Sequence, residues 1–438
     1  MSSDKFYPRV LVVNHDPFNS ERNNGMTMSN LFRGWPKDKL AQVYLSGIVP
    51  GFGTCENYWR LSEGDVVRRI FRRQVNSIVN KSLFENKFEG RIELLPENFV
   101  IRTLRKVDKK YTEPLREVFW RMPNIISPGL DKWINDFRPD VVYSMLGTSY
   151  LMRLAVKISE RFDIPLVPHF TDDWITTQYQ KCVGANLIRS NMMYWLNKLL
   201  EANPVRLVIC DAMAREYQKR YGGNFVPFVN CVDKDSFDPS CASVSKSAVR
   251  FVYIGGLHLN RWLSLKKIGQ VLHEICDVDG LKSELHIYTY PADVDRYRRE
   301  LETFPVVSVK GWVPNKDVPQ VLHDSDVLLH VESFDQEIRK YTKFSVSTKI
   351  PECMMAGRPI LAYGPMEAAS IAYVKESGAG IGIGWESRED IYCSLKELVV
   401  DKDLRLRLGN KARQVALELH DASAQNELFR NVLCKAIL

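Results

Sequence analysis

The sequence lacks the features that mark several large classes of protein. It has no apolar run near the roughly 20 residues that a membrane-spanning helix needs, and its polar start does not resemble a signal peptide. Its nine cysteines form no Cys-x-x-Cys pair, which argues against a disulfide framework. We find no internal repeat of fixed period. We therefore expect a cytoplasmic protein, or one that lies peripherally on the inner face of a membrane.

Two phosphate-binding signatures and metal-binding clusters are missing as well. The dinucleotide fingerprint Gly-x-Gly-x-x-Gly and the Walker A pattern are both absent from the sequence. No group of His, Cys and Asp residues has the spacing of metal ligands, so we expect no metal cofactor. Any phosphate site must then be built from other residues.

What is present is the composition of an ordinary globular protein. Of 438 residues, 45% are hydrophobic and 26% are charged, which excludes disordered, collagen-like and coiled-coil chains. A chain of this length is expected to form two or three domains.

The net charge of +7 is concentrated in one region. Between Arg60 and Trp120, 14 Lys and Arg residues stand against 9 Asp and Glu residues. The densest part contains four arginines: Arg68, Arg69, Arg72 and Arg73. We expect this patch either to contact an anionic membrane or acidic acceptor, or to be a solvated helix face. Because no recognised nucleic-acid-binding motif accompanies it, we expect no nucleic-acid partner.

Short apolar segments alternate with helix-length segments twice along the chain. The first series lies between residues 9 and 229, and the second lies between residues 251 and 383. This alternation is typical of parallel sheets that are covered by helices on both faces. The sequence therefore predicts an α/β fold with two doubly wound, Rossmann-like domains.

The boundaries of these domains follow from the composition. Residues 239–249 are polar and rich in serine, which predicts a linker. We expect one domain over residues 1–238 and a second over residues 250–415. A C-terminal helix over residues 416–438 is long enough to pack back on the first domain.

Two such domains that face a central cleft bind ligands at the carboxyl ends of their strands. In the first domain, Asn24, Gly25 and Met26 lie where a loop meets a helix. Backbone N–H groups there can approach an anionic or hydroxylated ligand, although the same residues can also form a plain turn.

A histidine and two carboxylates follow another strand of the first domain. His169 lies at the end of an apolar segment, and Asp172 and Asp173 come soon after it. We expect His169 to bond a sugar hydroxyl and either aspartate to orient or deprotonate an acceptor. The alternative is a packed histidine with an aspartate that caps the next helix.

Glycines and basic residues follow the first strand of the second domain. Gly255 and Gly256 permit a close approach to the backbone, and Arg261 and Lys266 are expected to converge on a diphosphate. The alternative is a pair of solvated basic residues at the start of a helix.

A second polar segment of this domain precedes another strand. It contains Ser347, Thr348, Lys349 and Glu352, and the glutamate lies at an expected helix start. Its carboxylate can accept two hydrogen bonds from a ribose diol, or it can simply be a favourable charge in the first turn.

These motifs together resemble the GT-B glycosyltransferases, and most closely the glycosyltransferase family 4 group that uses nucleotide sugars. The segment from Glu352 to Pro359 is similar to that group's Glu-Ala-Met-Ala-x-Gly-x-Pro, and Asn230 to Asp233 resembles its Asn-Gly-Val-Asp. The segment with Gly311, Trp312 and Val313 resembles the one beside the nucleotide base.

The resemblance implies a reaction as well as a fold. It implies transfer of a sugar from a UDP- or GDP-type nucleotide diphosphate sugar to a glycan or lipid-linked acceptor, with retention, without a metal, in surface polysaccharide synthesis. Arg261 and Lys266 would bind the diphosphate, Glu352 the ribose, and Ser347, Thr348 and Lys349 would contact the donor.

One position departs from the family pattern. The group's paired-glutamate motif has its first Glu eight residues before the second, where this chain has Phe344. Two alternatives therefore stay open: a nucleotide-sugar epimerase or hydrolase on the same fold, and a non-catalytic nucleotide-sugar-binding partner.

Overall fold

The chain contains two compact units. The computed structural model describes residues 5–20, 23–64, 78–79, 81, 108–121, 125–237 and 247–438. One unit comprises Met1–Phe228 with Asn426–Leu438, and the other comprises Val229–Gln425. The arginine patch at residues 68–73 lies outside the described residues, and so do residues 239–246 of the predicted linker.

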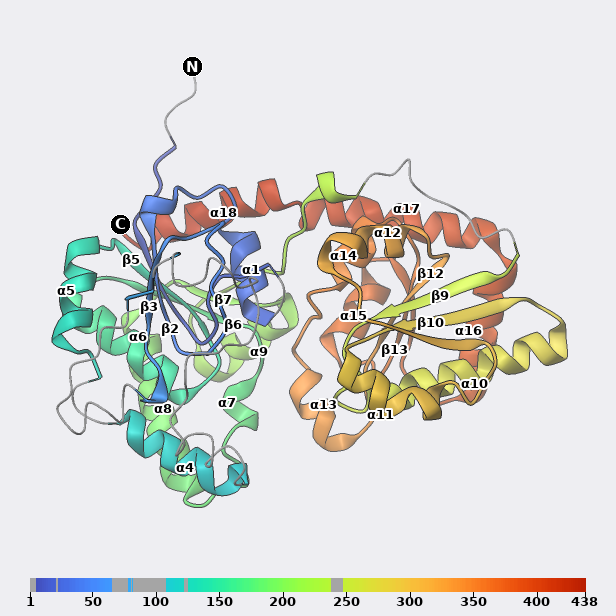
Figure 1. Cartoon of the computed structure of the whole chain (residues 1–438), viewed down its shortest axis with the longest axis horizontal. Helices are drawn as coiled ribbons and strands as arrows, with labels where there is room; N and C mark the ends of the chain where they lie inside the picture. The colour runs from blue at the N-terminus through green and yellow to red at the C-terminus, as the bar shows by residue number, and fades with distance from the viewer. Residues whose placement is uncertain are drawn as a thin grey trace. The chain divides into compact units, whose positions relative to one another are not determined.

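The first unit is built on an eight-stranded sheet in the order β4-β3-β2-β1-β5-β6-β7-β8 (Figure 1). The strands are β1 (Val10–Asn14), β2 (Leu40–Tyr44), β3 (Asn57–Arg60), β4 (Ile78–Val79), β5 (Val141–Leu146), β6 (Leu166–Phe170), β7 (Arg206–Val208) and β8 (Phe225–Pro227). All neighbouring pairs are parallel except β3 and β4. The strand order reverses between β1 and β5.

Helices accompany this sheet, and their starts follow local capping rules. They are α1 (Asn23–Leu31), α4 (Lys109–Trp120), α5 (Pro128–Phe137), α6 (Ser149–Phe162), α7 (Trp174–Thr177), α8 (Ala185–Ala202) and α9 (Asp211–Tyr221). The Thr148 hydroxyl, for example, accepts the Leu151 backbone N–H and caps α6.

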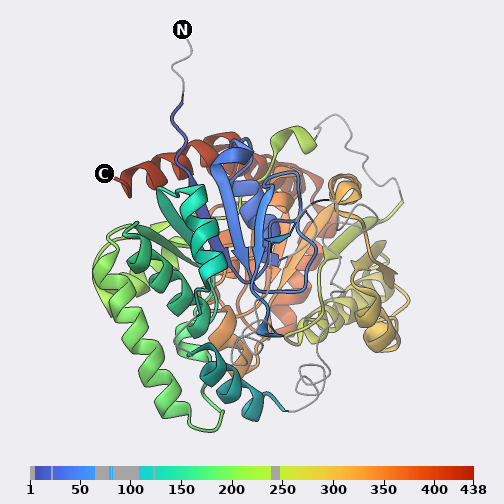
Figure 2. The same ribbon diagram turned by 60° about the vertical axis from the view of Figure 1, so that its left-hand side comes forward.

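The C-terminal helix packs on the first unit, as the sequence predicts. The ring of Phe429 in α18 (Ala422–Lys435) lies 5.0 Å from that of Phe32, 5.2 Å from Tyr143 and 5.8 Å from Phe228. Figure 2 shows α18 beside the strands of this unit. Phe429, Phe32 and Tyr143 are all buried in this aromatic cluster.

The second unit has a six-stranded, fully parallel sheet in the order β11-β10-β9-β12-β13-β14. Its strands are β9 (Val249–Ile254), β10 (Ser283–Tyr288), β11 (Val307–Gly311), β12 (Val327–Val331), β13 (Ile360–Tyr363) and β14 (Gly380–Ile383). Read in chain order this is the 3-2-1-4-5-6 arrangement of dinucleotide-binding folds. The order reverses between β9 and β12.

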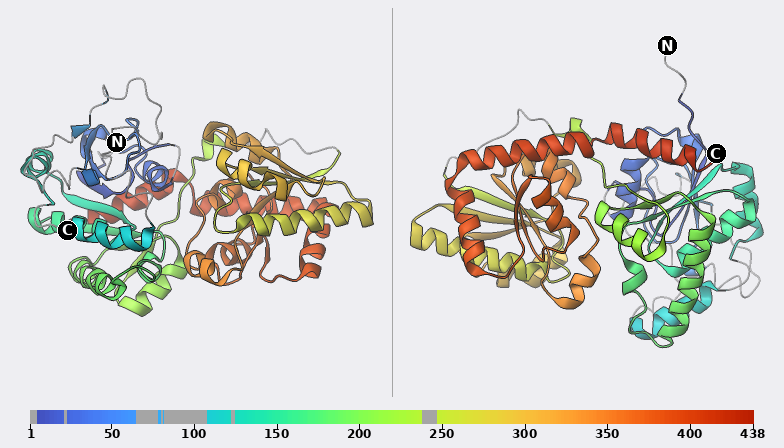
Figure 3. Two further views of the ribbon diagram at one scale, coloured as in Figure 1. Left: turned by 60° about the horizontal axis from the view of Figure 1, so that its bottom comes forward. Right: turned by 180° about the vertical axis from the view of Figure 1, so that it is seen from behind.

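The helices of the second unit are α10 (Arg261–Asp279), α11 (Pro291–Leu301), α12 (Val318–His323), α13 (Gln336–Thr342), α14 (Ile350–Met355), α15 (Ala369–Glu376), α16 (Arg388–Val400) and α17 (Lys402–Leu419). Figure 3 shows α10 running along the sheet. Gly269 lets α10 approach β11 closely, because a Cβ on Gly269 would lie 2.6 Å from Val307 Cγ2.

No helix within the described parts of the chain is long and apolar enough to cross a bilayer.

Candidate functional site

The switch point of the second sheet places glycines and charged residues at one edge. Parallel sheets bind ligands at the carboxyl ends of their strands, where the strand order reverses. Gly255 and Gly256 follow β9 directly, and Glu332 follows β12 directly. Arg261 begins α10. The residues at this edge therefore come from three segments: the ends of β9 and β12 and the start of α10.

Arg261 and Glu332 form a buried ion pair at this edge. Arg261 Nη2 lies 2.9 Å from Glu332 Oε1 and 3.2 Å from Oε2, and the two side chains are 18% and 4% exposed. Burial is the largest single effect and would lower the pKa of Arg261, but the charge of Glu332, the nearby Tyr253 and the hydrogen bond to Glu332 together raise that pKa. Burial would likewise raise the pKa of Glu332, yet His330 and Arg261 hold it below its usual value. Both groups therefore stay ionised.

Glu332 is fixed by its surroundings. His330 Nε2 lies 3.4 Å from Glu332 Oε1 and 2.9 Å from Ser370 Oγ. The Ser264 hydroxyl donates to the Glu332 carbonyl at 2.9 Å. A Cβ on Gly364 would lie 2.8 Å from Glu332 Cβ, so that position has no room for a side chain. We did not predict Glu332 from the sequence, although its place directly after a buried apolar strand was a usable signal.

Lys349 lies over the glycines that follow β9. Its Nζ donates to the Ile254 carbonyl at 3.1 Å. A Cβ on Gly255 would lie 2.7 Å from that Nζ and 2.8 Å from the Tyr253 hydroxyl, and one on Gly256 would lie 2.6 Å from His258 Nδ1. The side chains of Lys349 and His258 therefore lie directly against the backbone at Gly255 and Gly256.

Lys349 and Glu352 both titrate near neutral pH. Burial lowers the pKa of Lys349 to about 8, and the charge of Arg261 adds to this effect. Burial raises the pKa of Glu352 to about 7, against the attraction of Lys349. Glu352 lies in the first turn of α14. Groups with such shifts cluster at functional sites because their charge can change during binding or reaction.

Lys266 does not converge with Arg261, contrary to our expectation. The five-residue spacing rotates it about 140° around α10 relative to Arg261. Its Nζ instead lies 2.5 Å from Glu300 Oε2, on the partly exposed face toward α11. Lys349, which we expected only to contact the donor, is the second cation beside Arg261.

An exposed aromatic pair lies close to the same glycines. The rings of Trp312 and Tyr290 stack with centroids 4.7 Å apart and an interplanar angle of 20°. They are 43% and 41% exposed. Gly311, at φ 86°, makes the turn that presents Trp312, whereas Val313 is buried.

The loop before α14 is held by short polar contacts. The Asn230 side chain donates from Nδ2 to the Thr348 carbonyl at 2.9 Å, and Ser347 Oγ accepts the Lys349 backbone N–H at 3.4 Å. These contacts fix the backbone from which Lys349 extends.

His169 lies in the interior of the first unit, so the packed alternative describes it. Its side chain is fully buried in β6, and Nδ1 lies 2.8 Å from the Tyr143 hydroxyl. Burial lowers the pKa of His169 to about 4. A neutral, buried imidazole is not placed to bond a sugar hydroxyl.

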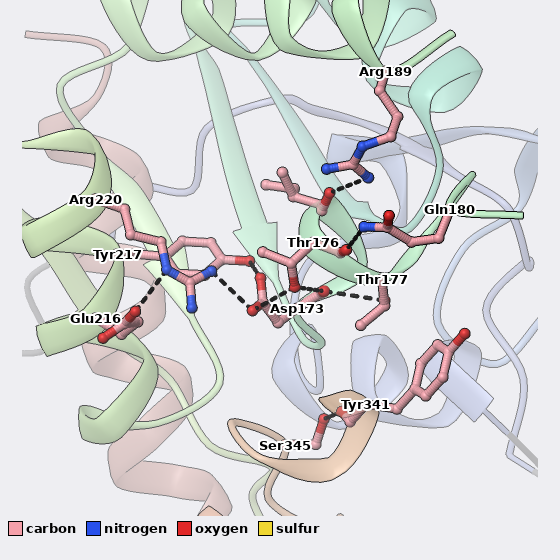
Figure 4. A network of polar contacts seen from close by, with 11 residues as sticks. Asp173, Thr176, Thr177, Gln180, Arg189, Glu216, Tyr217, Arg220, Tyr341 and Ser345 are labelled. Carbon is pink, nitrogen blue, oxygen red and sulfur yellow. Dashed lines mark hydrogen bonds and ion pairs between the residues drawn. The ribbon is translucent and has the colours of Figure 1, made fainter. Parts of the chain in front are cut away.

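Asp173 is engaged by three donors of its own unit (Figure 4). Tyr217 donates its hydroxyl to Oδ1 at 3.0 Å, while Thr176 Oγ1 and Arg220 Nη1 contact Oδ2 at 2.8 and 2.9 Å. This carboxylate is 3% exposed. Its hydrogen bonds indicate a structural anchor rather than the acceptor base that we expected, whereas Asp172 is exposed.

The glycine of the first-unit loop has a packing reason. Gly25 lies in the first turn of α1, between the partly exposed residues Asn24 and Met26. A Cβ there would lie 1.9 Å from Asn19 Nδ2 and 2.3 Å from the Pro17 carbonyl oxygen. The space where a side chain at Gly25 would lie is therefore occupied by the preceding loop.

In the described part of the chain, no group of three or more His, Cys, Asp or Glu side chains is arranged to hold a metal ion.

Comparisons with known proteins agree with this topology. Residues 269–429 match a family model described as glycosyl transferase-like. The chain carries a glycosyltransferase-like domain on a GT-B fold. No protein of curated function matches the sequence.

Several solved structures match this chain along almost its whole length. Sucrose-phosphate synthase from Thermosynechococcus elongatus is 11% identical, with a TM-score of 0.61, over 98% of this chain and 100% of the other. HepE from Anabaena, solved with UDP, is 12% identical, with a TM-score of 0.62, over 98% and 100%. WaaG is 12% identical, with a TM-score of 0.53, over 97% and 99%. The predicted GT-B fold is confirmed.

Proposed function

We propose that the transferase moves a sugar from a UDP- or GDP-type nucleotide diphosphate sugar to a glycan or lipid-linked acceptor. We propose further that it does so with retention and without a metal, in surface polysaccharide synthesis. The observation that carries the proposal is a pair of cations after β9. Lys349 Nζ donates to the Ile254 carbonyl at 3.1 Å, and Arg261 lies near enough for its charge to lower the pKa of Lys349. This arrangement lies at the switch point where such folds bind nucleotides.

The neighbours support the choice of donor and pathway. HepE was solved in complex with UDP and with UDP-glucose, and WaaG is described as a glycosyltransferase involved in lipopolysaccharide biosynthesis. Both share this chain's fold over at least 97% of its length.

The chemistry of the step requires positive charge at the leaving group. When the bond from sugar to diphosphate breaks, negative charge develops on the phosphate oxygens. Arg261 can offer the N–H groups that do not bond Glu332, and Lys349 adds a compact charge. Such a fixed arrangement stabilises the transition state more than the ground state.

The remaining contacts bind the nucleoside. Glu352, at the start of α14, would accept hydrogen bonds from the ribose diol. The stacked pair of Trp312 and Tyr290 offers an exposed aromatic face for the base. The nucleoside then fixes the diphosphate beneath Arg261.

Metal independence is proposed because cationic side chains take the role of a metal. Another class of sugar transferase uses an Asp-x-Asp pair for that purpose, and Asp324 and Asp326 have this spacing. Here Asp326 Oδ2 accepts the Arg250 backbone N–H at 2.8 Å and is 5% exposed, so it anchors β9 to β12.

The test is a thermal-shift series on the full chain with UDP, GDP and ADP and with their sugars, in the presence of a chelator. We expect UDP or GDP compounds to raise the melting temperature of the native chain, and Arg261→Ala to abolish the rise. Lys266→Ala is the matched control, because Lys266 lies on the same helix but faces Glu300. Stabilisation by no nucleotide diphosphate would refute the proposal.

Product analysis then separates the rival activities. A transferase consumes the nucleotide sugar only when an acceptor is present. An epimerase or hydrolase would convert the nucleotide sugar alone, and a non-catalytic partner would bind it without turnover on any acceptor in a broad panel.

A further inference from the structure

A histidine and an aspartate lie at the carboxyl edge of the first sheet, where its strand order reverses. His15 and Asp16 directly follow β1, and the order reverses between β1 and β5. Open α/β sheets bind ligands at this place. His169 and Asp173, which we expected to serve ligands in this unit, are instead 0% and 3% exposed.

His15 has one ring nitrogen that is available to a ligand. Its Nδ1 lies 3.0 Å from Asp16 Oδ1, and the two side chains are 51% and 13% exposed. Because a carboxylate only accepts hydrogen bonds, Nδ1 carries the proton and Nε2 of the neutral ring keeps its lone pair. Nε2 makes no hydrogen bond to any of the described residues. It can therefore accept a hydrogen bond from a hydroxyl group.

The backbone that carries this pair is fixed by the neighbouring strand. The His15 carbonyl accepts the backbone N–H groups of Leu45 and Ser46 at 3.0 and 2.8 Å. The Asp16 carbonyl accepts Gln42 Nε2 at 3.0 Å, and Gln42 is fully buried in β2. Burial of an amide costs free energy unless the amide is hydrogen-bonded, so the loop and Gln42 depend on each other.

Two buried amides hold the loop that follows β1. Gln42 Oε1 accepts the Phe18 backbone N–H at 2.9 Å, so this side chain bonds the loop at both Asp16 and Phe18. Asn14, 1% exposed, adds a hydrogen bond from Nδ2 to the Asp16 carbonyl at 3.3 Å. A backbone held in this way gives a binding side chain a fixed starting point, which precise orientation of a ligand requires.

The chain contains a second His–Asp pair that lacks this setting. His273 Nε2 lies 3.3 Å from Asp277 Oδ2, and the two side chains are 32% and 65% exposed. Both residues belong to α10, four positions apart, as in an ordinary pair on a helix surface. The place of His15 at a switch point and the buried amides beneath it distinguish the first pair from the second.

We propose that His15 binds the acceptor, with Nε2 accepting the hydrogen bond of the hydroxyl group that receives the sugar. Asp16 keeps the proton on Nδ1 and so leaves Nε2 as the acceptor atom. The ligand at this position is a neutral sugar hydroxyl of a glycan. The inference rests on the proposed function and deepens it, because it assigns an acceptor-binding residue to the first unit.

The experiment measures kcat/KM for the acceptor on the full chain, at about pH 7.5, where an ordinary imidazole is mostly neutral. The donor is the nucleotide sugar that gives the largest thermal shift, and the acceptors are octyl glycosides of glucose, galactose, mannose and N-acetylglucosamine. His15→Ala should lower kcat/KM about 100-fold, because the attacking hydroxyl is no longer oriented. His15→Gln should recover at least about tenfold of this loss, because an amide oxygen accepts the same hydrogen bond.

The matched control is His273→Ala, which removes the histidine of the other pair and should stay within about threefold of the native chain. The donor-dependent thermal shift should be the same in all of these variants. If the native chain shows neither this shift nor transfer to any glycoside, the proposed function fails. If the native chain shows both and His15→Ala transfers as fast, only the assignment of His15 fails.

The tautomer of His15 gives a second readout that does not require turnover. NMR of the chain with isotope-labelled histidine nitrogens distinguishes Nδ1–H from Nε2–H, and the His15 signal is the one that His15→Gln removes. We expect Nδ1–H in the native chain. Asp16→Ala removes the acceptor of that proton, so both tautomers should be populated in this variant.

Three outcomes would overturn the inference. The first is a His15→Ala variant whose kcat/KM for the acceptor stays within about threefold of the native value. The second is a native His15 that carries its proton on Nε2. The third is loss of the donor-dependent thermal shift in His15→Ala, which would assign His15 to the donor instead.

Discussion

The two sheets of this protein reverse their strand order in the same way but differ in what lies at their switch points. In the first unit, β1 ends in the buried Asn14, whose Nδ2 donates to the Asp16 carbonyl at 3.3 Å. After β5, the Gly147 carbonyl accepts Gln178 Nε2 at 2.7 Å. In the second unit the same edge carries Arg261 and Glu332 as a buried ion pair.

This difference teaches that strand order sets the place of a ligand, whereas the side chains at that place decide its chemistry. The second switch point suits an anion such as a diphosphate. The first one carries His15 and Asp16 directly after β1, with Nδ1 and Oδ1 3.0 Å apart, beside amides and backbone carbonyls. We therefore expect charge changes in the second unit to affect turnover and those in the first unit to affect stability.

The largest expected effect comes from Arg261→Ala. The variant loses the N–H donors aimed at the leaving diphosphate, so kcat should fall by about 100- to 1,000-fold. Steady-state kinetics on the purified chain measure this, with melting temperature as the check on folding. Lys266→Ala should stay within about threefold of the native chain. A similar loss in both variants would contradict the assignment of Arg261 and Lys349 as the pair of cations.

The second prediction concerns the carboxylate of the first unit. Asp173→Asn removes the ionised partner of Tyr217 and one of the two carboxylates that pair with Arg220, which keeps Glu216. The free energy of unfolding should therefore fall by about 2 kcal/mol. Urea unfolding measures the loss. The kcat of the folded enzyme should change little. A kcat that falls about 1,000-fold at unchanged stability would instead make Asp173 a catalytic base.

Particular residues show how much of the fold and of the candidate site can be predicted from the sequence. The alternation of apolar and helical segments is sufficient to predict two doubly wound sheets, because burial on both faces leaves a local signal. The rotation of Lys266 away from Arg261 depends on where α10 begins. If the helix began after Arg261, the two residues would not lie on the same helix, and the five-residue spacing would not fix the angle between their side chains.

Other site residues escaped prediction because their meaning depends on tertiary contacts. Glu332 pairs with Arg261, which lies 71 positions earlier, and no local pattern encodes that pairing. His169 and Asp173 follow a strand just as ligand-binding residues do. Only the packing of Tyr143 and Tyr217 against them shows that they are structural.

The third prediction uses the shifted pKa values in the second unit. Lys349, with a pKa of about 8, loses its charge as pH rises, which weakens attraction for a diphosphate. Glu352, with a pKa of about 7, is protonated as pH falls, which removes an acceptor for the ribose. Donor affinity should therefore peak between pH 7 and 8 and fall by up to about tenfold per pH unit outside this window.

Titration calorimetry with the nucleotide diphosphate across pH 6 to 9 checks this profile, at pH values spanning about one unit on either side of the peak. Lys349→Arg should extend high affinity to higher pH, because the guanidinium stays charged. An unchanged alkaline limb in that variant would show that another group titrates there.

The smallest effect is expected at His169 in the first unit. His169→Phe removes the hydrogen-bond partner of the buried Tyr143 hydroxyl, so the free energy of unfolding at pH 7 should fall by about 1 kcal/mol. The difference in unfolding free energy between variant and native chain changes sign at acidic pH. Burial lowers the pKa of His169 to about 4 in the folded chain, whereas an unfolded histidine titrates near 6.5.

The native chain should therefore lose stability as pH falls from about 6.5 toward 4, because the unfolded state binds the proton first. At pH 5 this loss amounts to about 2 kcal/mol, and His169→Phe does not suffer it. The variant should thus be less stable than the native chain at pH 7 and at least as stable at pH 5, as measured by urea unfolding. Donor affinity should be the same in both proteins at pH 7. A change in donor affinity would instead show that His169 contributes to ligand binding. The two switch points would then differ less in function.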